Sequence, residues 1–181
     1  PILVASSMVE KPGTIIHGGK NMEQRNKVRG IAHDMDVTKI TVTGVPDRPG
    51  IAAAIFTPLA RAGISVDTIV QNASANNITD LTFTIIKKDL PKAMEIIGPV
   101  AKEIGARECL SDSKLGKVSI IGTGMQNTPG YAAKMFQTLF AQDINIHLIT
   151  TSEIRITCII AEGKVKEAVK ALHKAFELDK G

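Results

Sequence analysis

A short loop in the first half of the chain combines the groups needed to hold both ends of a free amino acid. It reads GVPDRPGIA, residues 44–52, between an apolar strand-like segment and an alanine-rich helix-like segment. Such a loop leaves backbone N–H groups unpaired at the positive end of a helix dipole, where a carboxylate can bind. Asp47, beside them, could pair with an ammonium group. The same residues could instead only shape a turn and start the helix, and the sequence leaves both interpretations open.

Polar side chains also follow the next strand-like segment. Gln71 and Asn72 can donate and accept hydrogen bonds beside that loop, and the triplet Thr151, Ser152 and Glu153 holds the corresponding place in the second half of the chain. Polar residues at a strand end ordinarily face solvent. Their occurrence at two equivalent positions favours a functional role.

The correspondence arises because the chain repeats itself. Residues 40–69, ITVTGVPDRPGIAAAIFTPLARAGISVDTI, are echoed about 80 positions later by residues 118–149, VSIIGTGMQNTPGYAAKMFQTLFAQDINIHLI. Both copies run through a strand, a loop opened by glycine, Pro-Gly, an amphipathic stretch and a second strand. Two copies are too few for a solenoid, which needs three or more repeats, so the sequence predicts two small domains.

Periodicity predicts the same elements in both copies. In the first copy we expect a strand at 37–45, a helix from 51 to 59 that Pro58 kinks or ends early, strands at 64–71 and 81–86 around a turn at 75–77, a helix at 91–104 and a last strand at 107–110. In the second copy we expect strands at 118–122, 144–150 and 154–161 and helices at 131–141 and 165–176. This pattern is typical of a ferredoxin-like α+β sandwich, βαββαβ.

The second copy lacks a final strand. We expect residues 1–9 to supply it, which would interleave two tandem domains, and we interpret residues 10–36 as a polar connector because of their glycines and weak periodicity.

Composition excludes several classes of protein. The chain has 181 residues, 44% of them hydrophobic, so it is expected to bury a core and fold as a globular protein. Its net charge of +4 comes from Lys and Arg that alternate with Asp and Glu along the chain, which indicates solvated faces and not a nucleic-acid surface. Aromatic residues are only 3%, which counts against base stacking. No apolar run of membrane-spanning length or secretion signal is present, so a cytoplasmic protein is expected.

No catalytic or metal-binding constellation is evident. The segment HGGK, residues 17–20, lacks the spacing of a phosphate loop, and no histidine has partners for a triad. Cys109 and Cys158 form no CxxC or zinc spacing, and Cys158 lies on the apolar side of its strand, which indicates a core residue.

Taken in order, the segments GVPDRPGIAAAIF, VDTIVQN, TDLTFTI, KVSIIGTGM, PGYAAKMF and TSEIRI resemble the regulatory region of the aspartate kinase family, which phosphorylates aspartate in lysine, threonine and methionine synthesis. PILVASSMVEKPGTII resembles the end of that family's kinase domain. The resemblance covers nearly the whole chain. It implies paired ACT domains, effector-binding βαββαβ modules, and a division into residues 1–36 (end of the kinase domain plus linker), 37–111 (first ACT domain) and 112–181 (second).

The resemblance also implies two effector pockets, each drawing on both repeats. The first, typically for threonine, matches Asp47, Gly50, Ile51, Ala52, Gln71 and Asn72, closed by Asn145 and Ile146 of the partner ACT domain. The second, typically for lysine, matches Met125, Tyr131, Ala132, Ser152 and Glu153, closed by Val66 and Asp67. Carboxylates such as Asp67 and Glu153 suit a cationic side chain.

Some positions depart from the family pattern. Thr128 stands where relatives often have His, His147 where many have an acidic residue, and Ser65 where Asn is common. The Lys-Phe-Gly-Gly opening motif of the kinase part is absent, so ATP and Mg²⁺ are expected only on a separate catalytic part, with no cofactor and no phosphorylation by this chain alone.

The expected function is therefore an allosteric regulatory subunit or fragment of aspartate kinase (ATP:aspartate 4-phosphotransferase) that binds lysine, threonine or both for feedback inhibition. Its expected partners are a catalytic domain or subunit and a second copy of itself, with no nucleic acid and no membrane. The alternative left open is a stand-alone ACT-type amino-acid sensor that acts on another partner.

Overall fold

The computed structural model describes residues 2–4, 14–16, 28–72, 76–123, 125 and 128–179 of the chain. Strands β1 (Ile2–Val4) and β2 (Thr14–Ile16) form a small antiparallel pair. The remaining strands form one six-stranded sheet in the order β4-β5-β3-β6-β8-β7, with every neighbouring pair antiparallel. They are β3 (Gly30–Pro46), β4 (Ile69–Gln71), β5 (Ile78–Ile85), β6 (Glu108–Ile121), β7 (Ile146–Thr151) and β8 (Arg155–Ala161). The segment HGGK lies outside the described residues.

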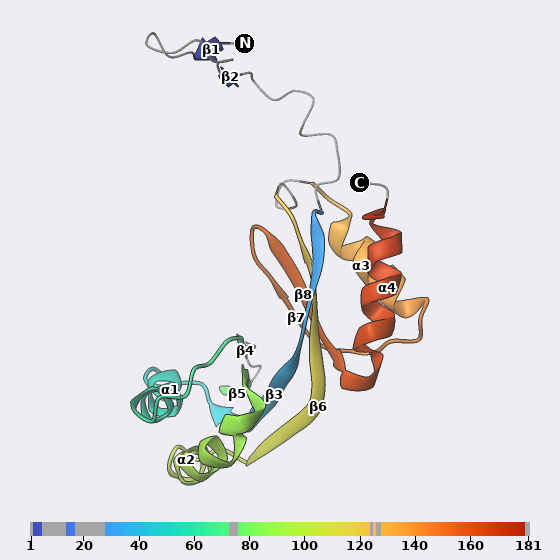
Figure 1. The fold of residues 1–181 in the computed structure, drawn as a ribbon. Helices are drawn as coiled ribbons and strands as arrows, with labels where there is room; N and C mark the ends of the chain where they lie inside the picture. Colours follow the sequence, from blue (N-terminus) through green and yellow to red (C-terminus); the bar gives the residue numbers. More distant parts are fainter. Residues whose placement is uncertain are drawn as a thin grey trace.

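Two long strands form the centre of this sheet. Strand β3 has 17 residues and β6 has 14, and they pair from Gly30 opposite Ile121 to Thr43 opposite Glu108. Figure 1 shows both strands running from the helix pair α3 and α4 to the helix pair α1 and α2. Register shifts between Asp34 and Val37 and between Val37 and Lys39 interrupt the ladder near its middle. Bulges of this kind bend a sheet and increase its twist.

Each long strand serves both repeats, which interleaves them. In the first repeat, the order across the sheet is β4, β5, the second half of β3 and the first half of β6. In the second, β7 and β8 are followed by the second half of β6 and the first half of β3. The expectation that residues 1–9 complete the second repeat is wrong, because residues 30–34 pair with residues 117–121 instead.

The interpretation of residues 10–36 as a connector is likewise wrong for its last part, which is strand. Polar side chains hide the strand in the sequence, because His33, Asp34 and Asp36 face solvent while Ile31 and Met35 pack on the second core. Strands expected at 107–110 and 118–122 are also one continuous strand, β6. Because β3 and β6 continue without a break past residues 36 and 111, the sheet marks no domain boundary there. The division of the chain at these two residues stays a prediction.

A pair of helices covers each half of the sheet. Helices α1 (Ile51–Arg61) and α2 (Leu90–Glu103) pack on the first half, and α3 (Tyr131–Phe140) and α4 (Val165–Ala175) on the second. Short 3₁₀ turns η1 (Lys87–Asp89) and η2 (Glu162–Lys164) precede α2 and α4. Each helix buries a stripe of apolar residues three or four positions apart, such as Ile51, Ile55 and Leu59 in α1, as the amphipathic pattern predicts.

Pro58 does not end helix α1 early. The helix continues to Arg61, and the Ala62 N–H donates to the Pro58 carbonyl at 3.1 Å. A proline removes only the hydrogen bond of its own missing N–H, so the last turn can close behind it. Gly63 follows in the left-handed conformation, φ 76°, as expected of a residue after a helix.

The repetition extends to individual hydrogen bonds. Thr41 and Thr82 are cross-strand neighbours in the first half, and their hydroxyl oxygens lie 3.1 Å apart. Ser119 and Thr157 hold the corresponding positions in the second half, and their hydroxyl oxygens lie 2.8 Å apart. The two repeats therefore share their side-chain geometry as well as their topology.

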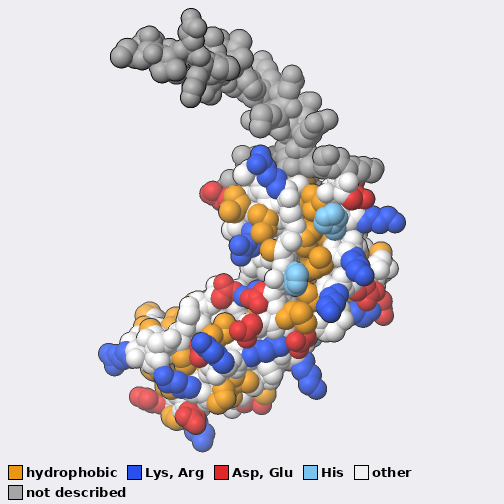
Figure 2. All heavy atoms as spheres, in the orientation of Figure 1, with side chains coloured by type: hydrophobic (Ala, Val, Ile, Leu, Met, Phe, Trp, Pro, Cys, Tyr) orange, Lys and Arg blue, Asp and Glu red, His pale blue; other side chains and the backbone are white. Residues whose placement is uncertain are grey.

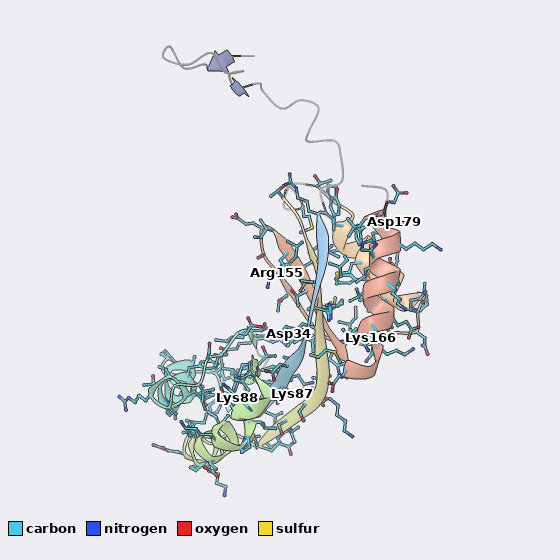
Figure 3. All side chains as sticks on the ribbon, viewed as in Figure 1. Asp34, Lys87, Lys88, Arg155, Lys166 and Asp179 are labelled. Carbon is cyan, nitrogen blue, oxygen red and sulfur yellow. The ribbon has the colours of Figure 1, made fainter. Side chains whose placement is uncertain are left out.

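Polar and apolar contacts join the two halves. Lys87 Nζ lies 2.9 Å from Glu162 Oε1, and the Lys87 backbone N–H donates to Asp36 Oδ1 at 2.9 Å. Beside them a small core cluster consists of Val37, Leu115 and Ile159, with Leu148 packed against it. Figure 3 labels Lys87 on η1 and Asp34 on β3 in this region. These contacts, together with the shared strands, hold the halves as one body.

Close packing at Gly116 predicts a strong effect of a single methyl group. A Cβ at this buried position would lie 2.5 Å from Val165 Cγ2 and 3.3 Å from the Asp34 carbonyl oxygen. Gly116→Ala should therefore lower the free energy of unfolding by about 1–3 kcal/mol, because it pushes α4 from the sheet. Urea denaturation measures this change.

A matched control is Gly98→Ala in α2, where a Cβ meets nothing within 4 Å. That substitution should raise stability by up to about 1 kcal/mol through helix propensity. Equal effects of the two substitutions would contradict the close approach of α4 to β6.

Candidate functional site

The turn that leads from β3 into α1 has the backbone geometry of an anion site. Gly50 precedes the helix in the left-handed conformation, φ 93°, and no side chain among the described residues caps this end. The first i−4 hydrogen bond is donated by Ala54 to the Gly50 carbonyl at 2.9 Å. The N–H groups before it, of Ala52 and Ala53, point along the helix dipole. A carboxylate placed there would meet N–H donors and a favourable potential.

The predicted residues of the first pocket gather around this turn. Asp47 is exposed, and its backbone N–H donates to the Asn77 carbonyl at 2.8 Å, which fixes the loop against the turn between β4 and β5. Asn72 belongs to the same turn, because its carbonyl accepts a hydrogen bond from the Thr79 hydroxyl. Ala52 and Gln71 are also exposed. The structure thus places an exposed carboxylate, an amide pair and helix N–H groups at one end of the first half-sheet.

Ile51 contributes differently from its neighbours. Its side chain is only 6% exposed and belongs to the first core, so only its backbone can contact a ligand.

The second repeat builds the same arrangement. Gly130 precedes α3 with φ 106°, again without a side-chain cap among the described residues, and Lys134 N–H donates to its carbonyl at 2.8 Å. The neighbouring turn joins β7 to β8, with the Ser152 N–H donating to the Arg155 carbonyl at 2.8 Å. Ser152 and Glu153 are exposed in this turn. The Gly122 N–H donates to the Ile154 carbonyl at 3.0 Å, which anchors the end of β6 beside it.

The other predicted residues of the second pocket are more buried. Met125 is 7% exposed and lies in the second core, and Tyr131 and Ala132 are partly buried against it. The Tyr131 ring stacks on Phe176 of the last turn, with centroids 6.3 Å apart, and Lys134 Nζ lies 5.0 Å from the Phe176 centroid. Tyr131, one of the residues predicted for this pocket, therefore packs against the end of α4.

The residues predicted to close each pocket lie on the opposite edge of the sheet from it. Asn145 and Ile146 stand at the start of β7, whereas Gln71, a predicted residue of the first pocket, ends β4. Val66 and Asp67 precede β4, whereas the second pocket lies beside β7. Since β4 and β7 are the two ends of the strand order and do not pair, the strand pairing of one chain does not join either pocket to its closing residues.

One contact of a predicted site residue was missed from the sequence. The Asp67 carboxylate forms an ion pair with the Lys117 ammonium group of β6, across the boundary between the repeats. The sequence does show that Lys117 corresponds to Lys39 of the first copy, which marks both lysines as repeated positions. Sequence spacing does not reveal which acidic residue either lysine contacts.

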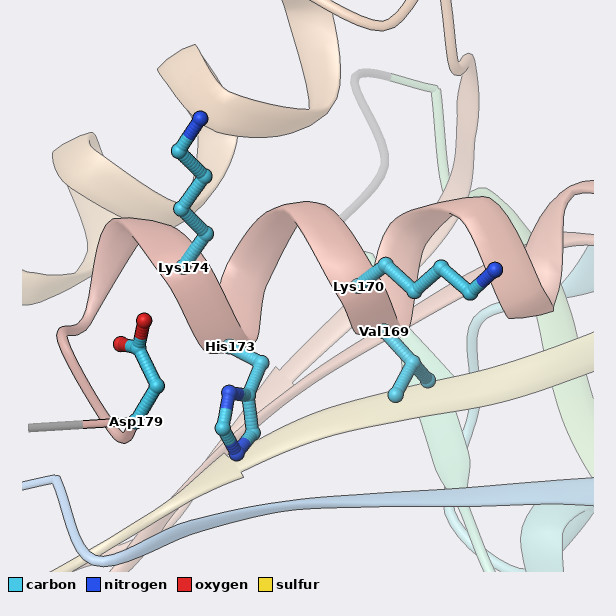
Figure 4. Close-up of a pocket in the computed structure, with 5 residues that line it drawn as sticks. All are labelled: Val169, Lys170, His173, Lys174 and Asp179. Carbon is cyan, nitrogen blue, oxygen red and sulfur yellow. The ribbon is translucent and has the colours of Figure 1, made fainter. Parts of the chain in front are cut away.

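Among the described residues, the surface outside these turns carries a hollow and no metal-binding cluster. The hollow has a volume of about 410 Å³ and lies along α4. Figure 4 shows the five residues that line it, Val169, Lys170, His173, Lys174 and Asp179, none of which is a predicted site residue. Within the described ranges no three His, Cys, Asp or Glu side chains are placed to hold a metal ion. Figure 2 shows Lys and Arg interspersed with Asp and Glu over the visible face. In the same part of the chain, no helix is long and apolar enough to cross a membrane.

The chain is similar to known proteins in both repeats. Family models of the ACT domain match residues 38–101 and 118–176. An aspartate kinase of Pseudomonas fluorescens (strain SBW25) is 47% identical over 181 residues, 99% of this chain and 44% of that protein. The chain thus spans about 44% of the length of the curated relative that it matches.

Two solved structures are similar along most of the chain. The regulatory subunit of aspartate kinase from Thermus thermophilus, in its ligand-free form, is 41% identical with a TM-score of 0.78, over 83% of this chain and 99% of that one. The aspartate kinase from Synechocystis is 38% identical with a TM-score of 0.80, over 93% of this chain and 29% of that one.

The two thiols should differ in reactivity. Cys158 is buried in the second core, and burial raises its pKa to about 12. Burial also raises the pKa of Cys109, which is partly exposed. Because the thiolate is the reactive form, native Cys158 should stay unreactive at pH 8, where an unfolded thiol with a pKa of about 8.5 is partly ionised.

A disulfide reagent at pH 8 tests this expectation in the Cys109→Ser variant. We expect no labelling of the native protein over minutes and one thiol after unfolding in guanidinium. Rapid native labelling would mean that β8 is not packed as described.

Proposed function

Because this chain belongs to the ACT-domain family and matches aspartate kinase regulatory regions along most of its length, we propose that it binds end-product amino acids and passes their occupancy to the catalytic part of that enzyme. The proposed effectors are lysine and threonine, and the proposed consequence is feedback inhibition of aspartate phosphorylation. The catalytic step itself is proposed for a separate part, because this chain matches only about 44% of the length of the aspartate kinase from Pseudomonas fluorescens.

The observation that carries the proposal is the duplicated helix-start turn. Each repeat presents a left-handed glycine before an uncapped helix, Gly50 or Gly130, next to a strand turn with exposed polar side chains. Free amino acids share an α-carboxylate and an α-ammonium group. Helix N–H groups suit the first, and a nearby carboxylate or amide oxygen suits the second.

The charges beside each turn support two different effectors. The first turn offers Asp47 with the amides of Gln71 and Asn72, and the other carboxylate at this loop, Asp80, already accepts a hydrogen bond from the Gly44 N–H at 2.9 Å. This set suits a neutral side chain such as that of threonine. The second turn offers Glu153, and Asp67 is proposed to approach it from the opposite edge of the sheet. Two carboxylates suit an amino acid with a second positive charge, such as lysine.

A second copy of the chain completes both pockets in this proposal. Strands β4 and β7 are the edges of the sheet, and each carries an exposed isoleucine at the same repeat position, Ile69 (54% exposed) and Ile149 (45%). Exposed apolar edges favour pairing with another chain. If β4 of one copy lies beside β7 of the other, a single twofold axis forms two such junctions. Each junction then brings one pocket to its closing residues.

Effector occupancy can affect the catalytic part through thermodynamic linkage between effector binding and the arrangement of the subunits. An effector can inhibit only if it binds the inhibited arrangement more tightly than the active one, and a coupling of about 1–3 kcal/mol is typical. Pockets that form between two copies supply this preference, because they exist only in one docked arrangement. The ATP and Mg²⁺ of the reaction are assigned to the catalytic part.

Calorimetry of the chain with lysine and threonine, singly and together, tests the proposed ligands. We expect saturable heat with at least one of them. Asp47→Ala should weaken binding at the first pocket, and Glu153→Ala at the second, each by roughly 10- to 100-fold, the effect of losing one hydrogen bond to a charged group.

The control is Glu103→Ala, which removes an exposed carboxylate at the end of α2 and should leave both isotherms unchanged. Absence of heat with either amino acid, in this chain and in the full-length enzyme, would contradict the proposed function.

Sedimentation tests the proposed edge pairing. Ile149→Lys places a charge at the centre of the proposed β4–β7 junction, so self-association should weaken by at least ~10-fold, which corresponds to about 1.4 kcal/mol. Leu110→Lys is the matched control, because Leu110 is similarly exposed (49%) but lies on β6, inside the sheet. Equal effects of both lysines would argue against dimerisation through the edges.

A further inference from the structure

The ion pair between Asp67 and Lys117 joins a proposed effector contact to the opposite repeat. Lys117 belongs to the half of β6 that pairs with β8, where its register partner is Ile159. Asp67 precedes edge strand β4 of the first repeat. The lysine side chain is only 17% exposed and the aspartate side chain 57%. The cation is therefore held mostly inside the protein, while the carboxylate is open to solvent on its other side.

Both ends of this pair are fixed by their surroundings. The Asp67 N–H donates to the Thr84 carbonyl at 3.0 Å, so the backbone before β4 is docked on β5. Cross-strand neighbours point to the same face of a sheet, which sets the stem of Lys117 beside Ile159 of the small core cluster. A long side chain can bury its methylene groups in this way while its charged end reaches a partner.

The other acid near Lys117 is engaged elsewhere. Asp34 is the cross-strand neighbour of Lys117 in β3, and its Oδ1 accepts a hydrogen bond from the Asp36 N–H at 2.8 Å. Asp67 is the acid that forms an ion pair with Lys117.

The repeat supplies an internal comparison for this pair. Lys39 corresponds to Lys117, since Lys39 pairs with Thr84 as Lys117 pairs with Ile159. His147 corresponds to Asp67 in the aligned copies. The pseudo-equivalent of the ion pair therefore combines a lysine with a histidine, which cannot form a salt bridge. The two repeats share one framework, and only one of them carries the acid.

We propose that Lys117 is a specificity-determining residue, an internal cation that occupies Asp67 until an effector with a cationic side chain competes for the same carboxylate. This inference rests on the proposed function and deepens it. A carboxylate already paired with one ammonium group offers a second one less net attraction. Lys117 therefore lowers the affinity of the pocket closed by Asp67 for cationic amino acids and leaves its affinity for neutral ones unchanged. Effector binding weakens a contact between the repeats.

The expected size of the effect follows from the exposure of the pair. Exposed ion pairs contribute little, and this pair is half-exposed on its acid side, so removal of the competitor should raise lysine affinity by roughly twofold to fivefold. A change of this size is small but is resolved by calorimetry when the variants are measured side by side.

The experiment compares Lys117→Met with Lys39→Met. Each variant of the chain is titrated with lysine, with norleucine, which has a linear apolar side chain without the ε-ammonium group, and with threonine. In Lys117→Met the ratio of the norleucine Kd to the lysine Kd should rise by about twofold to fivefold over the wild-type ratio. In Lys39→Met that ratio should stay the same. Threonine binding should be unaffected in both.

If Lys117 had only a structural role, its loss would change the affinities for all three ligands together. An unchanged ratio of the norleucine Kd to the lysine Kd in Lys117→Met therefore overturns the proposal, even if all affinities fall. If the wild-type chain and the full-length enzyme bind neither lysine nor threonine, the proposed function fails and this inference fails with it. If lysine binds but the ratio of the norleucine Kd to the lysine Kd is unchanged in Lys117→Met, only the proposed role of Lys117 is overturned and the proposed function stands.

A double-mutant cycle checks the ion pair without any ligand. The urea midpoints of wild type, Lys117→Met, Asp67→Asn and the double variant should be non-additive, because each single change leaves one partner unpaired. Additive effects would mean that the pair does not persist in solution and would overturn the proposal. The titration and the cycle therefore fail independently of each other.

Discussion

The antiparallel pairing of β3 with β6 is the constraint on which the rest of the molecule depends. The second repeat has only three strands in its own part of the chain, and its fourth is the first half of β3, which continues directly into the first repeat. A ferredoxin-like sandwich with a missing strand would leave apolar side chains and backbone groups open to water. The second repeat therefore cannot separate from the first without losing a strand of its own half of the sheet.

This sharing makes the two halves mechanically continuous. The bulges near Val37 bend the sheet where one repeat gives way to the other, and the apolar cluster around Leu115 fills the bend. The ion pair of Lys87 with Glu162 ties the starts of α2 and α4 to each other. The two helix layers are thus connected through packed side chains and a shared sheet.

Duplication provides two equivalent frames, and a few side chains make them chemically different. Gly50 and Gly130 adopt the same conformation, and the hydroxyl pairs of the two half-sheets occupy the same positions. The charged residues around these frames are not repeated, because Asp67 in one copy stands where the other has His147. Backbone geometry sets where an amino acid's common groups could bind, whereas the side chains that are not repeated decide which amino acid fits.

The sequence by itself determined the repeat, the family and the helices, because amphipathic periodicity and Pro-Gly turns are local signals. It also indicated the turns at Gly50 and Gly130, and the fold and family it implied are confirmed. Only the tertiary structure decided that residues 30–34 complete the second half of the six-stranded sheet, since polar side chains conceal a strand whose partner lies over 80 residues away. It alone showed that Lys117 reaches Asp67, because a contact between distant residues depends on how the sheet bends and not on their spacing in the chain.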